Sequence, residues 1–236
     1  MKRYLLVIEA AILHPTYKAV IICFLVIHAG SVQAQQTTVV AEDTAYVRVV
    51  HERAGKIVAA LAIKDEKKFK QAQDIIASQY RALNQLHEGS KLKVQQLKQN
   101  TGLTKEALDE SVKQEEADKE ANLARQHSVY IDQLKMVLTD EQIEQVKDGM
   151  TYRVLPTTYQ AHLDMIPSLT EEQKKQIYSW LVEARDHAMD AESSDKKHWW
   201  FGKYKGRINN YLAAQGYDLK KEREAWEIRK KEKAAR

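Results

Sequence analysis

The sequence predicts an all-α protein: a multi-helix bundle with a long polar helix or helical hairpin, followed by a more compact C-terminal helical half. Three observations support this prediction. The 236 residues include only eight glycines and three prolines, and strong helix formers dominate the rest. Apolar residues recur every three or four positions, which is the spacing of one helix face. Runs of β-branched residues joined by tight hairpin turns are missing.

The first 34 residues are expected to be a secretory signal peptide. Lys2 and Arg3 precede a short apolar run over residues 19–29, and the small-residue pattern of Val32 and Ala34 follows. A basic start, an apolar core and a small-residue cleavage site are typical of exported proteins. The run is shorter than the ~20 residues of a membrane-spanning helix, so a retained anchor is the less favoured alternative. We expect a periplasmic or secreted protein that meets the membrane only through this segment before cleavage.

Removal of the leader leaves an N-terminal helical region, 35–137, and a C-terminal helical region, 138–236, which we expect to form one continuous helical domain. Cys23 lies in the leader, so the remaining chain has no disulfide and no thiolate nucleophile or ligand. The leader takes three of the 37 basic and one of the 33 acidic residues, which leaves 34 and 32. This near balance argues against nucleic-acid binding, which needs a strong basic excess.

The N-terminal region is expected to contain four helices. The first covers about 43–62, and the second begins after an N-cap at Asp65 and ends at residues 87–89, where Gly89 follows the apolar stripe. A short helix over 91–97 precedes a break at 100–102. A long polar helix then covers 104–138. Its first half is acidic and is expected to be a solvated face, and the helix is a candidate for half of an antiparallel hairpin.

Two copies of a capping motif mark helix starts in the C-terminal region. LTDEQ occupies 138–142 and LTEEQ occupies 169–173. In each copy the threonine hydroxyl caps the backbone N–H three residues on, and the glutamine at that position returns to the threonine N–H. Between them, Pro156 fits the first turn of a helix that ends near Met165, before Pro167. A helix over 170–192 and a basic tail over 220–236 complete the region.

The stretch from Ser193 to Tyr217, SSDKKHWWFGKYKGRINNYLAAQGY, has the most particular composition in the chain. As a helix it would turn one apolar face inward. Another face aligns four candidate ligand-binding residues at spacings of four, four and three: Trp199, Lys203, Arg207 and Asn210. Gly202 and Gly206 offer a smooth strip beside them. A tryptophan beside basic residues can hold a sugar ring or an acidic group. The alternative is a tryptophan packed against a neighbouring helix and solvated basic residues.

A second candidate set lies just before this stretch. Glu183, His187 and Asp190 can share one helix face and could pair an acid with a base for hydrolysis. The two-histidine HExxH arrangement is missing, so neither a metal nor another cofactor is expected. The favoured alternative is a solvated polar face or salt bridges to Lys196 and Lys197.

Three segments carry a family resemblance: VKDGM (146–150), VLPTTYQAHLDMIPSLTEEQ (154–173) and AMDAESSDKKHWWFGKYKGRINNYLAAQGYDLKKE (188–222). They resemble a family of exported bacterial proteins that is catalogued only as a domain of unknown function. The resemblance implies a secreted or periplasmic protein of Bacteroidetes-type bacteria, often encoded near polysaccharide-degrading enzymes. It implies no activity, catalytic residue or cofactor.

The paired LTxxQ segments also resemble those of periplasmic helical chaperones of the Spy and CpxP kind. Three hypotheses follow. The first is an accessory protein of polysaccharide use that binds a glycan, or another exported protein, through the C-terminal aromatic and basic residues. The second is a carbohydrate-processing enzyme that uses the Glu183, His187 and Asp190 cluster. The third is a chaperone-like stress protein. Whether the protein is an enzyme stays open at this point.

Overall fold

The computed structural model describes residues 32–235, with side chains from residue 44 onward. Eight helices and no strand occur in this part of the chain, which confirms the all-α prediction. The predicted leader, 1–34, lies outside the described residues except for its last three. The chain divides into two units, Met1–Arg48 and Val49–Arg236, and the contacts and candidate sites discussed below belong to the second. No helix among the described residues is both long enough and apolar enough to cross a membrane.

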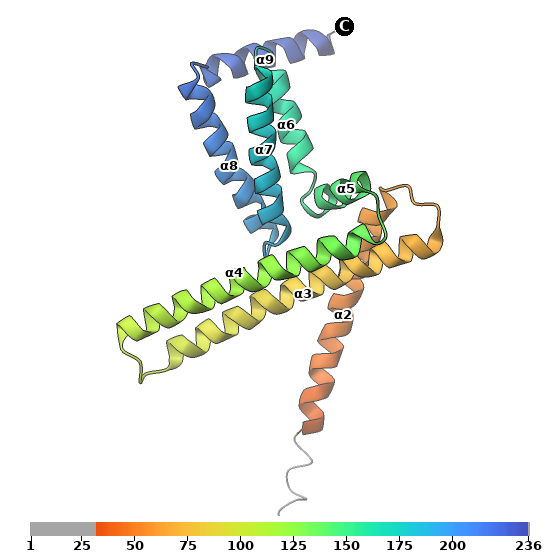
Figure 1. Ribbon diagram of the computed structural model, residues 1–236, viewed down its shortest axis with the longest axis vertical. Helices are drawn as coiled ribbons and strands as arrows, with labels where there is room; N and C mark the ends of the chain where they lie inside the picture. Colours follow the sequence, from red (N-terminus) through yellow and green to blue (C-terminus); the bar gives the residue numbers. More distant parts are fainter. Residues whose placement is uncertain (1–31, 236) are drawn as a thin grey trace, which may run out of the picture. The chain divides into compact units, whose positions relative to one another are not determined.

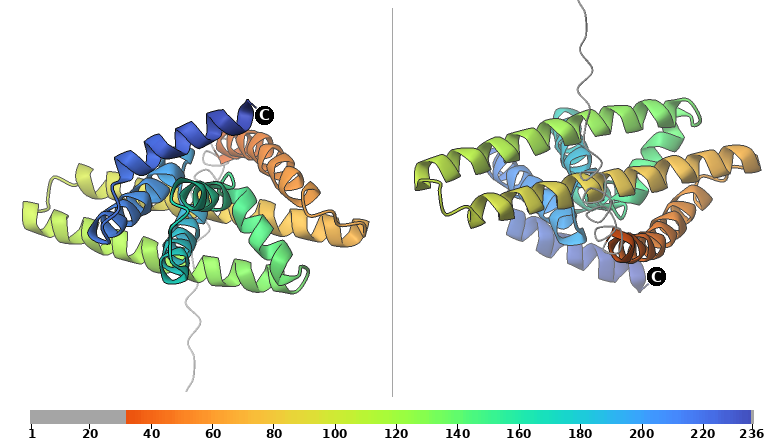
Figure 2. Two further views of the ribbon diagram at one scale, coloured as in Figure 1. Left: turned by 90° about the horizontal axis from the view of Figure 1, so that it is seen from above. Right: turned by 90° about the horizontal axis from the view of Figure 1, so that it is seen from below.

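The first half of the described chain contains three long helices: α2 (Val32–Ala59), α3 (Glu66–Gln99) and α4 (Lys105–Lys135). Helix α3 begins where predicted, because the Asp65 side chain accepts a hydrogen bond from the backbone N–H of Lys68. Helices α3 and α4 lie along each other as an antiparallel hairpin (Figures 1 and 2). The predicted hairpin and the predicted break near Gly102 are therefore confirmed.

The predicted end of the second helix at residues 87–89 is wrong. Helix α3 passes through Gly89 and includes the segment that was expected to be a separate short helix. A glycine inside a helix costs about 1 kcal/mol relative to alanine. Packing against α4 along its length outweighs this cost, and Ser90, the residue after Gly89, is buried. Local sequence alone does not contain that tertiary contribution.

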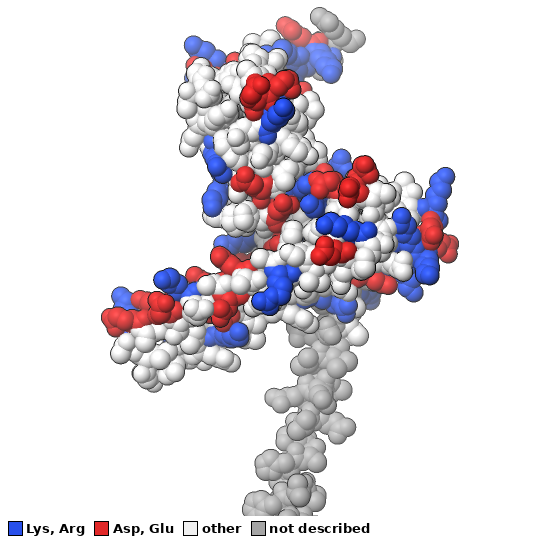
Figure 3. All heavy atoms as spheres, in the orientation of Figure 1, with Lys and Arg blue, Asp and Glu red and all other residues white. Residues whose placement is uncertain are grey.

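The acidic first half of α4 is solvated, as expected. Its glutamates and aspartates are exposed, apart from the partly buried Glu115, which pairs with Lys93 of α3 at 3.3 Å. Acidic side chains gather towards the free end of the hairpin in Figure 3. Two shallow cavities, of about 610 Å³ and about 330 Å³, lie along the hairpin between side chains of α3 and α4.

Three helices follow the hairpin: α5 (Asp140–Met150), α6 (Val154–Met165) and α7 (Glu171–Met189). Both predicted capping boxes are present, with Thr139 and Gln142 starting α5 and Thr170 and Gln173 starting α7. Pro156 lies in the first turn of α6, which ends at Met165 as predicted. Helix α7 ends three residues earlier than expected, and Asp190 becomes its C-cap.

The chain ends with α8 (Ser194–Ala214) and α9 (Leu219–Ala234). Helix α8 begins after Ser193, whose side chain accepts a hydrogen bond from the Lys196 N–H, and packs mainly against α7. Arg229 fixes α9 to the end of α6 by donating to the carbonyls of Asp164 and Met165 at 2.9 and 3.0 Å. One apolar core holds these helices together: Leu155, Ile166, Leu169, Ile177, Leu181, Ala184, Ala188, Phe201, Tyr204, Ile208 and Leu212.

Candidate functional site

The two predicted faces of α8 are present: one faces the core and the other faces the solvent. Phe201, Tyr204, Ile208 and Leu212 are buried in the core. The four candidate ligand-binding residues, Trp199, Lys203, Arg207 and Asn210, all lie exposed on another side of the helix. Trp199 keeps 53% of its surface accessible, which does not fit the alternative of a tryptophan packed against a neighbouring helix.

Trp199 is held in place by its neighbours on α8. It meets the adjacent Trp200 edge to face, with 5.0 Å between ring centroids. The ammonium group of Lys203 lies 5.5 Å from the Trp199 ring and 4.9 Å from the Trp200 ring, and that of Lys196 lies 5.7 Å from Trp199. Each contact is within the range of cation–π attraction. The exposed indole of Trp199 therefore contacts the Trp200 ring and lies within cation–π range of two ammonium groups.

A second aromatic and basic cluster lies further along α8 and includes residues of the neighbouring helix α7. Arg207 places its guanidinium carbon 4.5 Å from the centre of the Trp180 ring, which comes from α7. Trp180 in turn meets Tyr211 edge to face at 5.2 Å. Arg207 Nη1 lies 3.5 Å from a carboxylate oxygen of Glu183. We call Trp180, Trp199, Trp200, Lys203 and Arg207 together the aromatic–basic face.

The two glycines of α8 leave open space on the helix. A Cβ atom built on Gly202 or Gly206 would meet nothing within 4 Å. The smooth strip expected there is therefore present, and no backbone from the described part of the chain occupies it. Asn210, one turn beyond Gly206, is exposed.

The three candidate catalytic residues have separate partners in the structure. Glu183 pairs with Arg207, and His187 stacks on Trp200 with 4.2 Å between ring centroids. Asp190, at the end of α7, accepts a hydrogen bond from Nδ1 of His127 on α4 at 2.7 Å. None of the three pairs with Lys196 or Lys197 in the contacts of the described residues. The structure therefore does not bring Glu183, His187 and Asp190 into one acid–base pair.

The helices that form this site lie within a segment that matches a known protein family. The family model described as "Protein of unknown function (DUF3826)" matches residues 47–233, which include α3 to α8 and nearly all of α9. The chain belongs to this family. The expected membership of a family of unknown function is thereby confirmed. No curated protein matches the chain.

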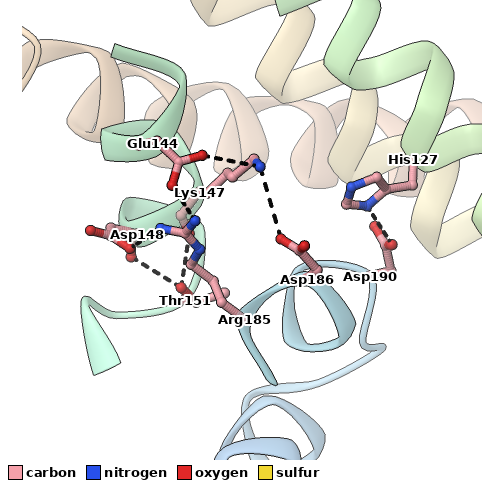
Figure 4. A network of polar contacts seen from close by, with 8 residues as sticks. All are labelled: His127, Glu144, Lys147, Asp148, Thr151, Arg185, Asp186 and Asp190. Atoms are coloured by element: carbon pink, nitrogen blue, oxygen red, sulfur yellow. Dashed lines mark hydrogen bonds and ion pairs between the residues drawn. The ribbon is translucent and has the colours of Figure 1, made fainter. Parts of the chain in front are cut away.

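A second polar arrangement in this DUF3826 protein lies where α5 meets α7, and sequence reasoning missed it. Arg185 of α7 is 2% exposed and donates to two carboxylates of α5, those of Glu144 and Asp148 (Figure 4). The bond to Asp148 is 2.7 Å long. Burial opposes the charge of Arg185, but the two carboxylates outweigh it and raise the pKa of Arg185. This ion triad fixes α5 against α7.

Four further polar residues connect the hairpin to the ends of α7 and α8, and we call them the polar junction: His87, His127, Asp190 and Lys197. His87 Nε2 donates to the Asp190 carbonyl at 2.7 Å, while His127 binds the Asp190 side chain. Lys197 Nζ donates to the Met150 carbonyl at 3.0 Å and lies 5.7 Å from the Tyr80 ring. Figure 4 shows His127 and Asp190 pointing towards each other from α4 and α7.

The environment of Lys197 disfavours its charge. Its side chain is 7% exposed, and burial together with the positive charge of Arg53 lowers its pKa to about 8. Burial also raises the pKa of Tyr130, whose hydroxyl contacts the sulfur of Met150. One carboxylate oxygen of Asp190 is buried without a hydrogen-bond partner. Among the described residues, no group of three histidine, cysteine or acidic side chains is placed to hold a metal ion.

The hydrogen bond from His127 to Asp190 predicts a pH-dependent contribution to stability. This bond raises the pKa of His127 above its usual 6.5. The stabilisation is therefore full below pH 6.5 and is lost as the pH rises through the higher folded-state pKa. In Asp190→Asn we expect the pKa of His127 to fall, and the free energy of unfolding at pH 6 to fall by about 1 kcal/mol. Titration of the imidazole NMR signals and urea unfolding at pH 6 and 8 measure both effects.

The exposed Asp195→Asn is the control for this prediction. An unchanged His127 titration in Asp190→Asn would contradict the prediction.

The exposed residues of the candidate site on α8 could be predicted from the sequence, but their contacts with other helices could not. Trp180 and Trp200 are both only partly buried and complete the aromatic–basic face. Lys197 was named as a salt-bridge partner of the acidic residues before it, but it is buried and donates to the Met150 carbonyl. Its position three residues before Trp200 and four before Phe201, at helical spacing, could have indicated an inward direction. The pairing of His127 with Asp190 joins residues 63 positions apart and leaves no local signal.

Proposed function

We propose that this protein is exported and binds a glycan through the aromatic–basic face of α7 and α8, as an accessory protein of polysaccharide use. Export rests on the leader-like N-terminal sequence, and the link to polysaccharide use rests on the family resemblance of the C-terminal segments. The exposed, laterally fixed ring of Trp199 carries the binding proposal. Flat aromatic rings offer a rigid apolar surface to the C–H faces of a sugar at little cost in side-chain entropy.

The arrangement around Trp199 is suited to a ligand that is partly apolar and partly polar. Trp200 and Lys203 restrict the Trp199 ring from one side, so little rotamer freedom remains to be lost on binding. The Lys203 ammonium supplies hydrogen-bond donors near that ring, and the Arg207 guanidinium supplies further donors beside Trp180. The open strip at Gly202 and Gly206 leaves room for a ligand between the helix backbone and these side chains.

The experiment is a binding titration of the purified protein with a panel of neutral and acidic oligosaccharides, followed by tryptophan fluorescence and by calorimetry. We expect saturable binding to at least one member. Trp199→Ala should weaken that binding at least about tenfold, because it removes a central aromatic contact. Circular dichroism checks that the variant remains folded.

Trp226→Ala is the matched control, since Trp226 lies on α9 beside Lys230 and is not part of the aromatic–basic face. It should leave the affinity unchanged within about twofold. The proposal fails if calorimetry detects no binding across the panel, or if the Trp199 and Trp226 variants weaken binding equally. In that case suppression of client aggregation would test the chaperone hypothesis.

A further inference from the structure

We infer that the ligand of the aromatic–basic face is an acidic glycan, whose carboxylates are bound by Arg207 and Lys203 while its sugar rings lie against the tryptophans. This inference rests on the proposed function and specifies the chemical class of its ligand. It is carried by the positions of the cations, which are independent of the exposure of Trp199.

Arg207 has the geometry of a carboxylate receptor. Its guanidinium lies over the Trp180 ring at 4.5 Å, and its side chain is 55% exposed. Stacking on an aromatic ring fixes the plane of a guanidinium and leaves its N–H edge available for a bidentate bond to a carboxylate. An arginine held in this way loses little freedom when an acidic ligand arrives.

The contact between Arg207 and Glu183 uses only one donor of the guanidinium. One nitrogen, Nη1, lies 3.5 Å from one oxygen of Glu183, which is long for a charge-assisted hydrogen bond. The remaining donors of the guanidinium have no partner among the contacts of the described residues. Glu183 is 46% exposed and also accepts a hydrogen bond from the Tyr204 hydroxyl. A ligand carboxylate can therefore bind to the remaining donors of Arg207 beside Glu183.

The charge of the face favours an anion. Lys196 and Lys203 lie beside Trp199, and Arg207 lies beside Trp180, while Glu183 is the carboxylate that contacts these cations. Lys203 has no ion pair among the described residues, and its ammonium is held by the two indole rings alone. A neutral glycan would leave these donors to water, whereas a carboxylate would gain charge-assisted bonds from them.

The spacing of the cations fits a repeating ligand. Lys203 and Arg207 are four residues apart on α8, so their Cα atoms are separated by a rise of about 6 Å along the helix. The two cations therefore extend from neighbouring turns of one helix, and a ligand that carries a carboxylate on more than one sugar unit can contact both. An aromatic ring accompanies each cation, Trp199 and Trp200 beside Lys203 and Trp180 beside Arg207. The pairing of a ring with a charge at each step matches a uronate unit, which has an apolar ring face and one carboxylate.

The experiment compares an oligogalacturonate with its fully methyl-esterified form, which has the same sugar rings and no charge. We expect the acid to bind at least about tenfold more tightly than the ester at 0.05 M salt, and this advantage to shrink at 0.5 M salt because exposed charges are screened. Arg207→Gln should weaken binding of the acid about tenfold and binding of the ester less than about twofold. Lys203→Gln should act in the same direction.

Lys205→Gln is the control, because Lys205 is an exposed lysine of the same helix outside the aromatic–basic face. It should leave both affinities unchanged. Equal binding of acid and ester, with loss in Trp199→Ala, would overturn the acidic class and leave glycan binding intact. Binding of neither sugar would overturn both proposals. Tighter binding of an acidic peptide than of the oligogalacturonate would overturn this inference in favour of a protein ligand.

Discussion

Replacing Arg185 with methionine is expected to lower the free energy of unfolding by about 3 kcal/mol at pH 7. The arginine is almost fully buried and binds Glu144 and Asp148 of α5. Without it, Asp148 has no other ion-pair partner among the described residues, while Glu144 keeps its pair with Lys147 at 3.1 Å. Asp148 is 17% exposed, so hydration recovers little of its stabilisation, while the 46% exposed Glu144 regains water more readily. Urea unfolding followed by circular dichroism measures the change.

Two further variants test the cause of that loss. Arg81→Met removes an exposed arginine and should change stability by less than about 0.5 kcal/mol. Adding Asp148→Asn to Arg185→Met should recover part of the loss, because it removes the carboxylate that loses its cation, whereas Glu144 keeps Lys147 at 3.1 Å. The contribution of this ion triad to the free energy of unfolding depends on pH, and the sign of the change can be stated. Burial opposes ionisation of Glu144, but Arg185 and Lys147 lower its pKa, so its contribution is present above pH 4.5 and is lost as the pH falls below that value. A loss of stability that does not shrink in acid would contradict an ionic origin.

Between pH 8 and pH 10.5, the wild type is expected to gain about 3 kcal/mol of stability relative to Lys197→Met. The pKa of Lys197 is about 8 in the folded protein and returns to about 10.5 on unfolding. The unfolded chain therefore binds more protons in this window, and stability rises with pH until the unfolded lysine also loses its proton. A difference of this size in pKa corresponds to about 3 kcal/mol. Below pH 8 both states carry the charge, and the cost of burying it is constant.

Urea unfolding of both proteins at a series of pH values gives this difference directly, because titration of all other groups cancels in the comparison. Lys196→Met is the matched control, since Lys196 is the preceding residue of α8 and is exposed. Its pH profile should run parallel to that of the wild type. Parallel profiles for Lys197→Met as well would contradict a buried lysine of lowered pKa.

The helix starts of the C-terminal half could be predicted because their signals are local. Thr139 and Thr170 satisfy their own first turns, and no distant residue is needed to form a capping box. Helix ends were less accurate for the same reason. The continuation of α3 through Gly89 depends on α4, and the end of α7 at Met189 leaves Asp190 free to bind His127. These outcomes depend on contacts between segments that the sequence does not place side by side.

In the candidate site, too, the local features could be predicted and the contacts between helices could not. Trp199, Lys203 and Arg207 follow from helical spacing within one stretch, and the structure places all three on one exposed side of α8. The partners from α7 could not be assigned, because the angle and register between α7 and α8 decide whether Arg207 reaches Trp180 or Glu183. The burial of Lys197 depends in the same way on Met150 and Tyr80, which lie on α5 and α3.

The aromatic–basic face comes entirely from two helices that follow each other in the sequence, between Trp180 and Arg207. Its contacts therefore have low contact order, and closing the short connection between α7 and α8 costs little chain entropy. Such a surface can form early in folding, before the more distant contacts of His87 and His127 with the end of α7 are made.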